Sequence, residues 1–187
     1  MKIVIAPDSF KESLSAVSVA ACIEKGFREI FPDADYVTLP LADGGEGTVD
    51  VLLQGLAGQK RTHQVEGPLG ALVHAEWAML EPSDSNPNKT ALIEIAAASG
   101  LDLLKPEQRD PLVASSFGTG QLILEAIERG AQTIILGLGG SATNDGGAGI
   151  VQALGGRLLD SKVQDGKGQE LNRGGAALAE LASIDLT

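Results

Sequence analysis

Apolar residues along this chain form two kinds of pattern. Short continuous apolar runs at 3–6 and 133–138 are typical of strands that are buried on both faces, as in parallel sheets. Behind Ser15, a favourable N-cap residue, apolar positions recur every three or four residues up to Pro32. This spacing predicts an amphipathic helix that follows the first strand.

The pattern predicts further elements downstream. A strand at 36–41 completes a strand–helix–strand unit, which is usually parallel and right-handed. Thr48 is expected to cap the next helix, which ends near Gly55. The later elements are helices at 119–129 and 148–154, a short strand at 157–159, a turn at 165–168 and a weakly helical tail from 176.

The middle of the chain has a different, two-residue period. Segments 62–66 and 72–80 alternate apolar and polar positions on either side of a Gly-Pro turn, which predicts an antiparallel hairpin. A strand at 90–96 follows after a polar loop. Residues 59–106 are therefore read as a β-rich insertion, or as part of a second domain.

Together these elements predict an α/β protein. We expect a Rossmann- or flavodoxin-like parallel sheet with helices on both faces, formed by residues 1–58 and 107–187 as one discontinuous domain. The β-rich segment 59–106 would interrupt it.

Charge and composition narrow the function classes. With 14 Lys and Arg against 25 Asp and Glu, the net charge is −11, which disfavours nucleic acid or an anionic membrane as a partner. Cys22 is the only cysteine, and His63 and His74 leave little for a histidine-based metal site. No apolar run approaches the roughly 20 residues of a membrane helix, and the N-terminus lacks a signal-peptide pattern, so we expect a cytoplasmic protein.

Three loops follow predicted strands, at 7–11, 43–47 and 139–147. Ligands of open α/β sheets bind beyond the carboxyl ends of strands, so these loops are the candidate site. The first places Asp8, Ser9 and Lys11 together, where a lysine and a carboxylate can hold an anionic group and a hydroxyl. The alternative is a turn with a solvated lysine.

The second and third loops are rich in glycine. Asp43 and Glu46 accompany three glycines in the second loop and favour magnesium or substrate hydroxyls, although a tight turn with exposed acids is the alternative. Small residues throughout the third loop favour a phosphate cradle, with close helix–sheet packing as the alternative. The spacing Gly137-x-Gly139-x-x-Ala142, with Asp160 further on, also fits a dinucleotide fingerprint.

Several segments resemble the bacterial glycerate kinases, the glycerate kinase type 1 family, in the same order. They are MKIVIAPDSFKESLS at 1–15, DGGEGT at 43–48, EIAAASGL at 94–101, RDP at 109–111, SFGTG at 116–120 and GGSATNDGG at 139–147. The resemblance extends to about Gly156. Since members of that family continue well beyond residue 187, the chain is similar to the N-terminal portion of such a kinase.

The resemblance implies a two-domain enzyme that transfers a phosphoryl group from ATP to D-glycerate, giving phosphoglycerate, with ATP and Mg²⁺ as cofactors. On this basis the catalytic candidates are Lys11, Asp8 and Asp43, and the metal ligands are Asp43 and Glu46. Candidates for substrate or phosphate binding are Ser9, Gly44, Gly45, Glu46, Gly47, Arg109, Gly139, Gly140, Ser141, Asn144 and Asp145.

Some questions stay open at this level. The sequence does not decide which loop binds ATP, which hydroxyl of glycerate is phosphorylated, or where the general base lies, which the C-terminal part of the family chain could supply. The alternatives are a dinucleotide-dependent oxidoreductase and a non-catalytic ligand-binding module. Self-association as a homo-oligomer is left open, and we expect the 187-residue chain alone to be slow or inactive.

Overall fold

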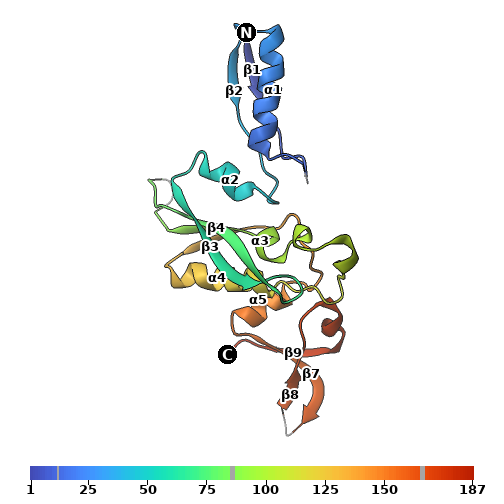
Figure 1. The fold of residues 1–187 in the computed structure, drawn as a ribbon. Helices are drawn as coiled ribbons and strands as arrows, with labels where there is room; N and C mark the ends of the chain where they lie inside the picture. The colour runs from blue at the N-terminus through green and yellow to red at the C-terminus, as the bar shows by residue number, and fades with distance from the viewer. Residues whose placement is uncertain (12, 85–86, 165–166) are drawn as a thin grey trace.

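The computed structural model describes residues 1–11, 13–84, 87–164 and 167–187. This part of the chain contains three sheets, with two, four and three strands. Figure 1 shows them following one another from the N-terminal end to the C-terminal end of an elongated molecule.

The first sheet belongs to the predicted strand–helix–strand unit. β1 (Lys2–Ile5) and β2 (Asp35–Thr38) are parallel, and α1 (Ala16–Ile30) connects them. The Ser15 side chain caps α1 by accepting a hydrogen bond from the Ser18 N–H at 3.3 Å. One helix covers only one face of the two strands, so Val4 of β1 keeps 57% of its surface exposed.

The second sheet forms the centre of the molecule. Its strands are β3 (Gly58–Glu66), β4 (Leu72–Leu80), β5 (Thr90–Glu94) and β6 (Thr133–Gly137), in that spatial order. β3, β4 and β5 are antiparallel neighbours, whereas β5 and β6 are parallel. The helices of this region are α2 (Thr48–Leu53), α3 (Ile95–Ser99), α4 (Phe117–Glu128) and α5 (Ala148–Ala153), with single 3₁₀ turns at Leu101–Leu103 and Pro106–Gln108.

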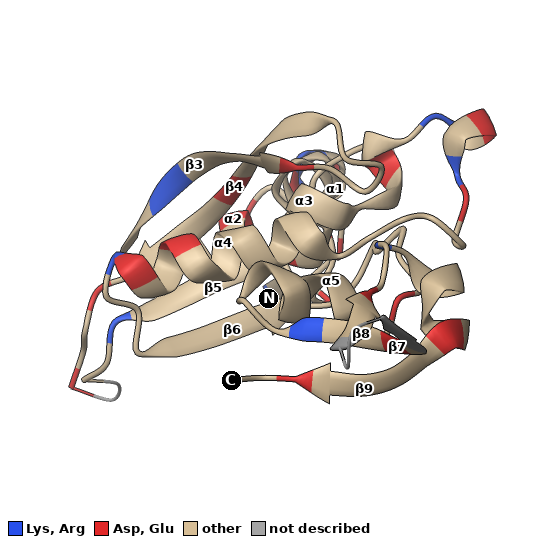
Figure 2. Cartoon of the chain, turned by 90° about the horizontal axis from the view of Figure 1, so that it is seen from below, with Lys and Arg blue, Asp and Glu red and all other residues tan. Residues whose placement is uncertain are grey.

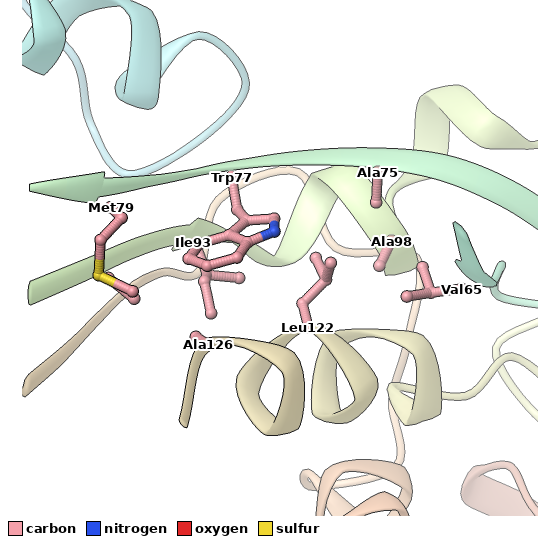
Figure 3. Packing of buried hydrophobic residues seen from close by; sticks show 9 residues of the cluster. Val65, Ala75, Trp77, Met79, Ile93, Ala98, Leu122 and Ala126 are labelled. Carbon is pink, nitrogen blue, oxygen red and sulfur yellow. The ribbon is translucent and has the colours of Figure 1, made fainter. Parts of the chain in front are cut away.

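The main core lies between this sheet and α4 (Figure 3). Trp77 from β4 and Ile93 from β5 meet Leu122 and Ala126 from α4, and all four are almost fully buried. A smaller cluster on the other side of the sheet joins Leu92 to Val49 of α2. Side chains that alternate along β4 and β5 therefore anchor helices on both faces.

A buried carboxylate ties α4 to α5. Asp145 is 1% exposed, and its Oδ2 accepts hydrogen bonds from the Ser116 N–H at 2.8 Å, the Ser116 hydroxyl at 3.0 Å and the Gly149 N–H at 3.2 Å. Its Oδ1 accepts from the Gly147 N–H at 3.1 Å. Gly149 permits the close approach, because a Cβ there would lie 2.4 Å from the Phe117 nitrogen.

The third sheet is antiparallel and contains β7 (Arg157–Gln164), β8 (Lys167–Glu170) and β9 (Leu181–Asp185). A 3₁₀ helix at Gly175–Glu180 precedes β9. Arg173 pairs with Glu66 and stacks over the Phe117 ring, 3.3 Å from its centroid. These contacts fasten the C-terminal segment to the central unit.

The structure does not confirm a single parallel sheet. Within the described residues, parallel pairing is found at β1–β2 and β5–β6, and the antiparallel hairpin β3–β4 belongs to the same mixed sheet as β5 and β6. The architecture is α/β at the level of a central sheet with helices. The division into a discontinuous domain with 59–106 inserted stays a prediction.

Several local predictions change. The strand expected at 90–96 ends at Glu94, where α3 begins, and the strand expected at 157–159 continues to Gln164. The N-cap of α2 is Gly47, in a left-handed conformation, and not Thr48. The tail contains β9, which the weak helical pattern did not indicate. Within the predicted turn at 165–168, residues 165–166 lie outside the described part of the chain.

Acidic residues outnumber basic ones along the ribbon, in keeping with the net charge of −11 (Figure 2). Among the described residues, no helix is both long and apolar enough to cross a membrane.

Replacing the buried carboxylate should destabilise the chain. In Asp145→Asn one acceptor oxygen becomes an NH₂ donor that faces N–H and O–H groups, and we expect a loss on the order of 3 kcal/mol in the free energy of unfolding. Denaturant unfolding followed through Trp77, the only tryptophan and fully buried, measures it. The exposed control Asp33→Asn should change stability by less than about 0.5 kcal/mol. Equal stability of the two variants would refute the assigned role of Asp145.

Candidate functional site

A cleft of about 820 Å³ separates the N-terminal unit from the central sheet. Its walls come from residues 8–11 and 13–17, which lead into α1, from the start of α2, from β3 and β4, and from the end of β5 with the segment that follows it. This volume lies within the range of roughly 300–1,000 Å³ of small-molecule sites. The cleft is therefore the candidate site of the described residues.

The structure brings some of the predicted site residues together and leaves others elsewhere. Those that line the cleft are Asp8, Ser9, Lys11, Glu46, Gly47 and Arg109. Those that do not line it are Asp43, Gly44, Gly45, Gly139, Gly140, Ser141, Asn144 and Asp145.

The first loop brings the Lys11 ammonium group and the Asp8 carboxylate to the lining of the cleft. The exposed Lys11 lies just before α1, whose first turn carries no acidic residue. Asp8 Oδ1 accepts a hydrogen bond from the Ser9 N–H at 2.6 Å. The free N–H groups at a helix N-terminus and a nearby ammonium group both attract anions, so this wall suits a phosphate or carboxylate.

The two glycine loops pack directly on each other. The Gly139 N–H donates to the Gly44 carbonyl at 2.9 Å. A Cβ on Gly137 would lie 2.5 Å from that same oxygen, and a Cβ on Gly139 would lie 2.6 Å from the Cα of Gly45. Since real Cβ atoms do not approach so closely, this contact requires glycine whether or not a ligand binds here. The role of these glycines in binding stays a prediction.

Polar groups of the third loop have partners inside the protein. The Ser141 hydroxyl lies 2.9 Å from the Thr143 hydroxyl and accepts a hydrogen bond from the Thr143 N–H at 3.1 Å. The Gly140 carbonyl accepts from the Leu101 N–H at 2.9 Å. Asp145 is buried between α4 and α5, where a substrate does not reach it. Its position favours a structural role over the predicted contact with phosphate.

Glu94, at the end of β5, was missed as a site residue. It lines the cleft, and its carboxylate accepts hydrogen bonds from the Val49 N–H at 2.6 Å and the Gly47 N–H at 3.3 Å. Burial raises the pKa of Glu94, and these two hydrogen bonds oppose the rise. A carboxylate that ends an apolar strand is the signal from which it could have been found.

Glu46 and Asp102 face each other in the cleft. The hydrogen bond between the two side chains raises the pKa of Glu46, and burial and the charges of Asp102 and Glu94 add to the rise. Two carboxylates this close favour a shared proton or a cation between them. Asp102 was not a candidate in the sequence because it lies 56 residues from Glu46 along the chain.

A second cationic group comes from the hairpin. Lys60 Nζ lies 2.5 Å from a Glu76 oxygen and 2.9 Å from an Asp50 oxygen, and these hydrogen bonds raise the pKa of Lys60. His74 lies beside them in the lining of the cleft. Residues from β3, β4 and α2 meet here, which no local spacing in the sequence indicates.

The proposed metal ligands fit a magnesium ion only in part. Asp43 Oδ1 accepts the Gly45 N–H at 2.9 Å and so stabilises its own turn, outside the cleft lining. In the described part of the chain, no group of three or more His, Cys, Asp or Glu side chains could hold a metal ion. Mg²⁺ commonly takes one or two carboxylates with the rest from water and phosphate, which the pair Glu46 and Asp102 can supply.

The dinucleotide hypothesis gains no support. Gly137 and Gly139 pack against the other glycine loop, and Asp160 lies in β7 of the third sheet, buried and accepting a hydrogen bond from the Gln169 N–H at 3.0 Å. In a dinucleotide site the acidic residue instead contacts the ribose beside the glycine loop.

Comparison with known proteins agrees with the resemblance seen in the motifs. Residues 3–187 match the model of the glycerate kinase family. The chain is 58% identical over 187 residues to "Glycerate 2-kinase" of Escherichia coli strain K12 and 54% identical over 187 residues to "Glycerate kinase" of Bacillus subtilis strain 168. In both cases 100% of this chain is covered but only 46% of the relative, so the chain spans about half the length of these curated relatives.

A solved structure agrees as well. The crystal structure assigned as glycerate kinase 2 from Salmonella typhimurium LT2 superposes with a TM-score of 0.75 and 56% sequence identity, covering 100% of this chain and 48% of that one. None of these relatives is named as an oxidoreductase or as a binding module. The family match over residues 3–187 and the identities above 50% lead to one conclusion: the chain belongs to the glycerate kinase family.

Proposed function

We propose that this chain provides the substrate cleft of an ATP-dependent glycerate kinase that converts D-glycerate to phosphoglycerate. The observation that carries the proposal is the cleft itself, whose lining includes Lys11, the start of α1 and the carboxylates of Glu46 and Asp102. Cationic groups and paired carboxylates in one cleft suit a transferred phosphoryl group together with a metal ion. The proposal includes a cytoplasmic location, where ATP and small organic acids occur.

Phosphoryl transfer from ATP to glycerate requires groups that stabilise negative charge and a group that accepts a proton. A hydroxyl oxygen of glycerate attacks the γ-phosphorus of ATP, the bond to the β–γ bridging oxygen breaks, and ADP leaves with that electron pair. Lys11 neutralises charge on the transferred group or on the glycerate carboxylate, and Arg109 is a second anion ligand in the same cleft. Asp8, which lines the cleft, is the proposed acceptor of the proton that the attacking hydroxyl loses, whereas Asp43, the other candidate, lies outside the lining.

Magnesium would be held by the facing carboxylates Glu46 and Asp102, with phosphate oxygens as further ligands. When bound, the ion would supply positive charge to the phosphate oxygens. The chain's own residues orient glycerate and neutralise its carboxylate.

The direct test is turnover by the complete gene product with ATP, Mg²⁺ and D-glycerate, in an assay that couples ADP formation to NADH oxidation. Phosphorus NMR of the product identifies which hydroxyl carries the phosphate, and L-glycerate serves as the control substrate. Formation of phosphoglycerate supports the proposal. Absence of ADP formation above the rate without glycerate would refute it. The 187-residue chain alone stays predicted to be slow or inactive.

Removing the Lys11 ammonium should reduce catalysis without affecting the fold. We expect Lys11→Ala to lower kcat/KM about 100-fold, since a charge contact to the transition state is lost. Lys25→Ala is the matched control, because Lys25 is an exposed lysine on α1 outside the cleft lining. Similar kcat/KM values for the two variants would show that Lys11 is only a solvated surface residue.

Neutralising Glu46 should weaken magnesium binding. Mg²⁺ prefers a charged carboxylate to an amide, so Glu46→Gln should raise the Mg²⁺ concentration for half-maximal activity about tenfold. Asp43→Asn should have a smaller effect, because Asp43 Oδ1 is occupied by the Gly45 N–H and an asparagine oxygen can accept the same bond. Magnesium titrations of both variants check this, and a larger effect at Asp43 would restore the ligand set first predicted.

A further inference from the structure

The Glu94 carboxylate connects two parts of the chain that are far apart in sequence. Glu94 ends β5, an interior strand of the central sheet whose residues are all buried. Its Oε1 accepts the Val49 N–H at 2.6 Å and its Oε2 accepts the Gly47 N–H at 3.3 Å. One side chain thus uses both oxygens to hold the segment that leads into α2.

That segment has no cap of its own. Gly47, the N-cap of α2, has no side chain, and the Thr48 hydroxyl donates to the Gly45 carbonyl at 2.7 Å instead of accepting an N–H. The first N–H groups of a helix lack partners within the helix and need an acceptor from outside. Glu94 is that acceptor for two of them.

The 44–47 loop, which Glu94 holds through Gly47, forms part of the lining of the cleft. Glu46 immediately precedes Gly47 and faces Asp102 across the cleft. On the other side, Gly44 and Gly45 pack on Gly137 and Gly139. Gly137 is also the residue that Glu94 pairs with across the parallel strands β5 and β6. The ends of β5 and β6 therefore hold the 44–47 loop together, one by a side chain and the other by backbone contact.

We propose that Glu94 is a positioning residue, whose carboxylate fixes the 44–47 loop, and with it Glu46, in the arrangement that receives substrate. The inference rests on the proposed function for what the cleft receives, but not for the position of the loop. Glu94 acts through the loop and needs no contact with substrate.

The free energy of unfolding distinguishes a positioning role of Glu94 from a purely structural one. Burial raises the pKa of Glu94 above its value in the unfolded chain, so stability falls as the pH rises past the unfolded pKa and the carboxyl ionises. Asp50 and Glu46 oppose the ionised form, while Lys60 favours it. At neutral pH a glutamine should therefore be tolerated by the fold as a whole. It nevertheless serves only one of the two N–H groups, since its NH₂ repels the other.

The test compares Glu94→Gln and Glu94→Asp with the natural protein, using the complete gene product. In the absence of ligand, Glu94→Gln should raise amide hydrogen exchange about tenfold at whichever of Gly47 and Val49 faces the new NH₂ group, since that hydrogen bond is lost. Glu94→Asp should raise it about tenfold at both amides, since the shorter side chain no longer reaches them. KM for glycerate or the Mg²⁺ requirement should rise about tenfold, because a displaced loop misplaces Glu46. The Tm of Glu94→Gln at pH 7 should not fall below that of the natural protein.

Ile93→Val is the matched control, because Ile93 precedes Glu94 on β5 but belongs to the core cluster on the α4 side of the sheet. It should lower stability by about 1 kcal/mol with unchanged exchange at Gly47 and unchanged KM. Unchanged exchange at Gly47 and Val49 in both Glu94 variants would overturn the inference. So would a fall in kcat alone in Glu94→Gln, which would make Glu94 a catalytic residue. If the natural protein shows no kinase activity, the proposed function fails, while the exchange data still decide the role of Glu94.

Discussion

The rest of the structure depends on the backbone contact between the two glycine loops. Gly44 and Gly45 lie so close to Gly137 and Gly139 that there is no room for a Cβ on either Gly137 or Gly139. Through this contact the loop that follows β2 is placed at the carboxyl ends of β5 and β6. Without it the N-terminal unit, which shares no sheet with the central strands, would lack this fixed point beside the cleft.

Two buried carboxylates, Asp145 and Glu94, stabilise the ends of the two glycine loops by hydrogen bonds. Asp145 accepts hydrogen bonds from N–H and O–H groups at the starts of α4 and α5 and so stabilises the end of the 139–147 loop. Glu94 accepts hydrogen bonds from the N–H groups at the start of α2 and so stabilises the end of the 43–47 loop. Both are buried acceptors for helix N-termini. They differ in surroundings, because Asp145 is enclosed by protein whereas Glu94 reaches the cleft.

The sequence predicts the elements better than their assembly. Local patterns identify α1 with its Ser15 cap, the hairpin β3–β4 and the buried strand β6, because periodicity and caps depend on neighbouring residues. They do not show that the hairpin joins β6 in a mixed sheet, since pairing partners are set by tertiary packing. Lys11 and Glu46 could be identified because they lie in loops after strands. Glu94 was missed although a carboxylate at the end of an apolar strand is a local signal, whereas Asp102 and Lys60 could not be identified, because residues distant in sequence meet only in the folded chain.

The same limit applies to glycine. A glycine-rich loop after a strand predicts close approach of the backbone, but the sequence does not say whether a ligand or another loop approaches.

The proposed function requires that substrates bind in the cleft beside Lys11 and Glu46. A crystal structure of the complete gene product with Mg²⁺, a non-hydrolysable ATP analogue and D-glycerate tests it most directly. We expect glycerate and the terminal phosphate to bind between Lys11 and Glu46. Ligands bound instead against residues 139–147, with the cleft empty, would contradict the proposed position of the substrate site.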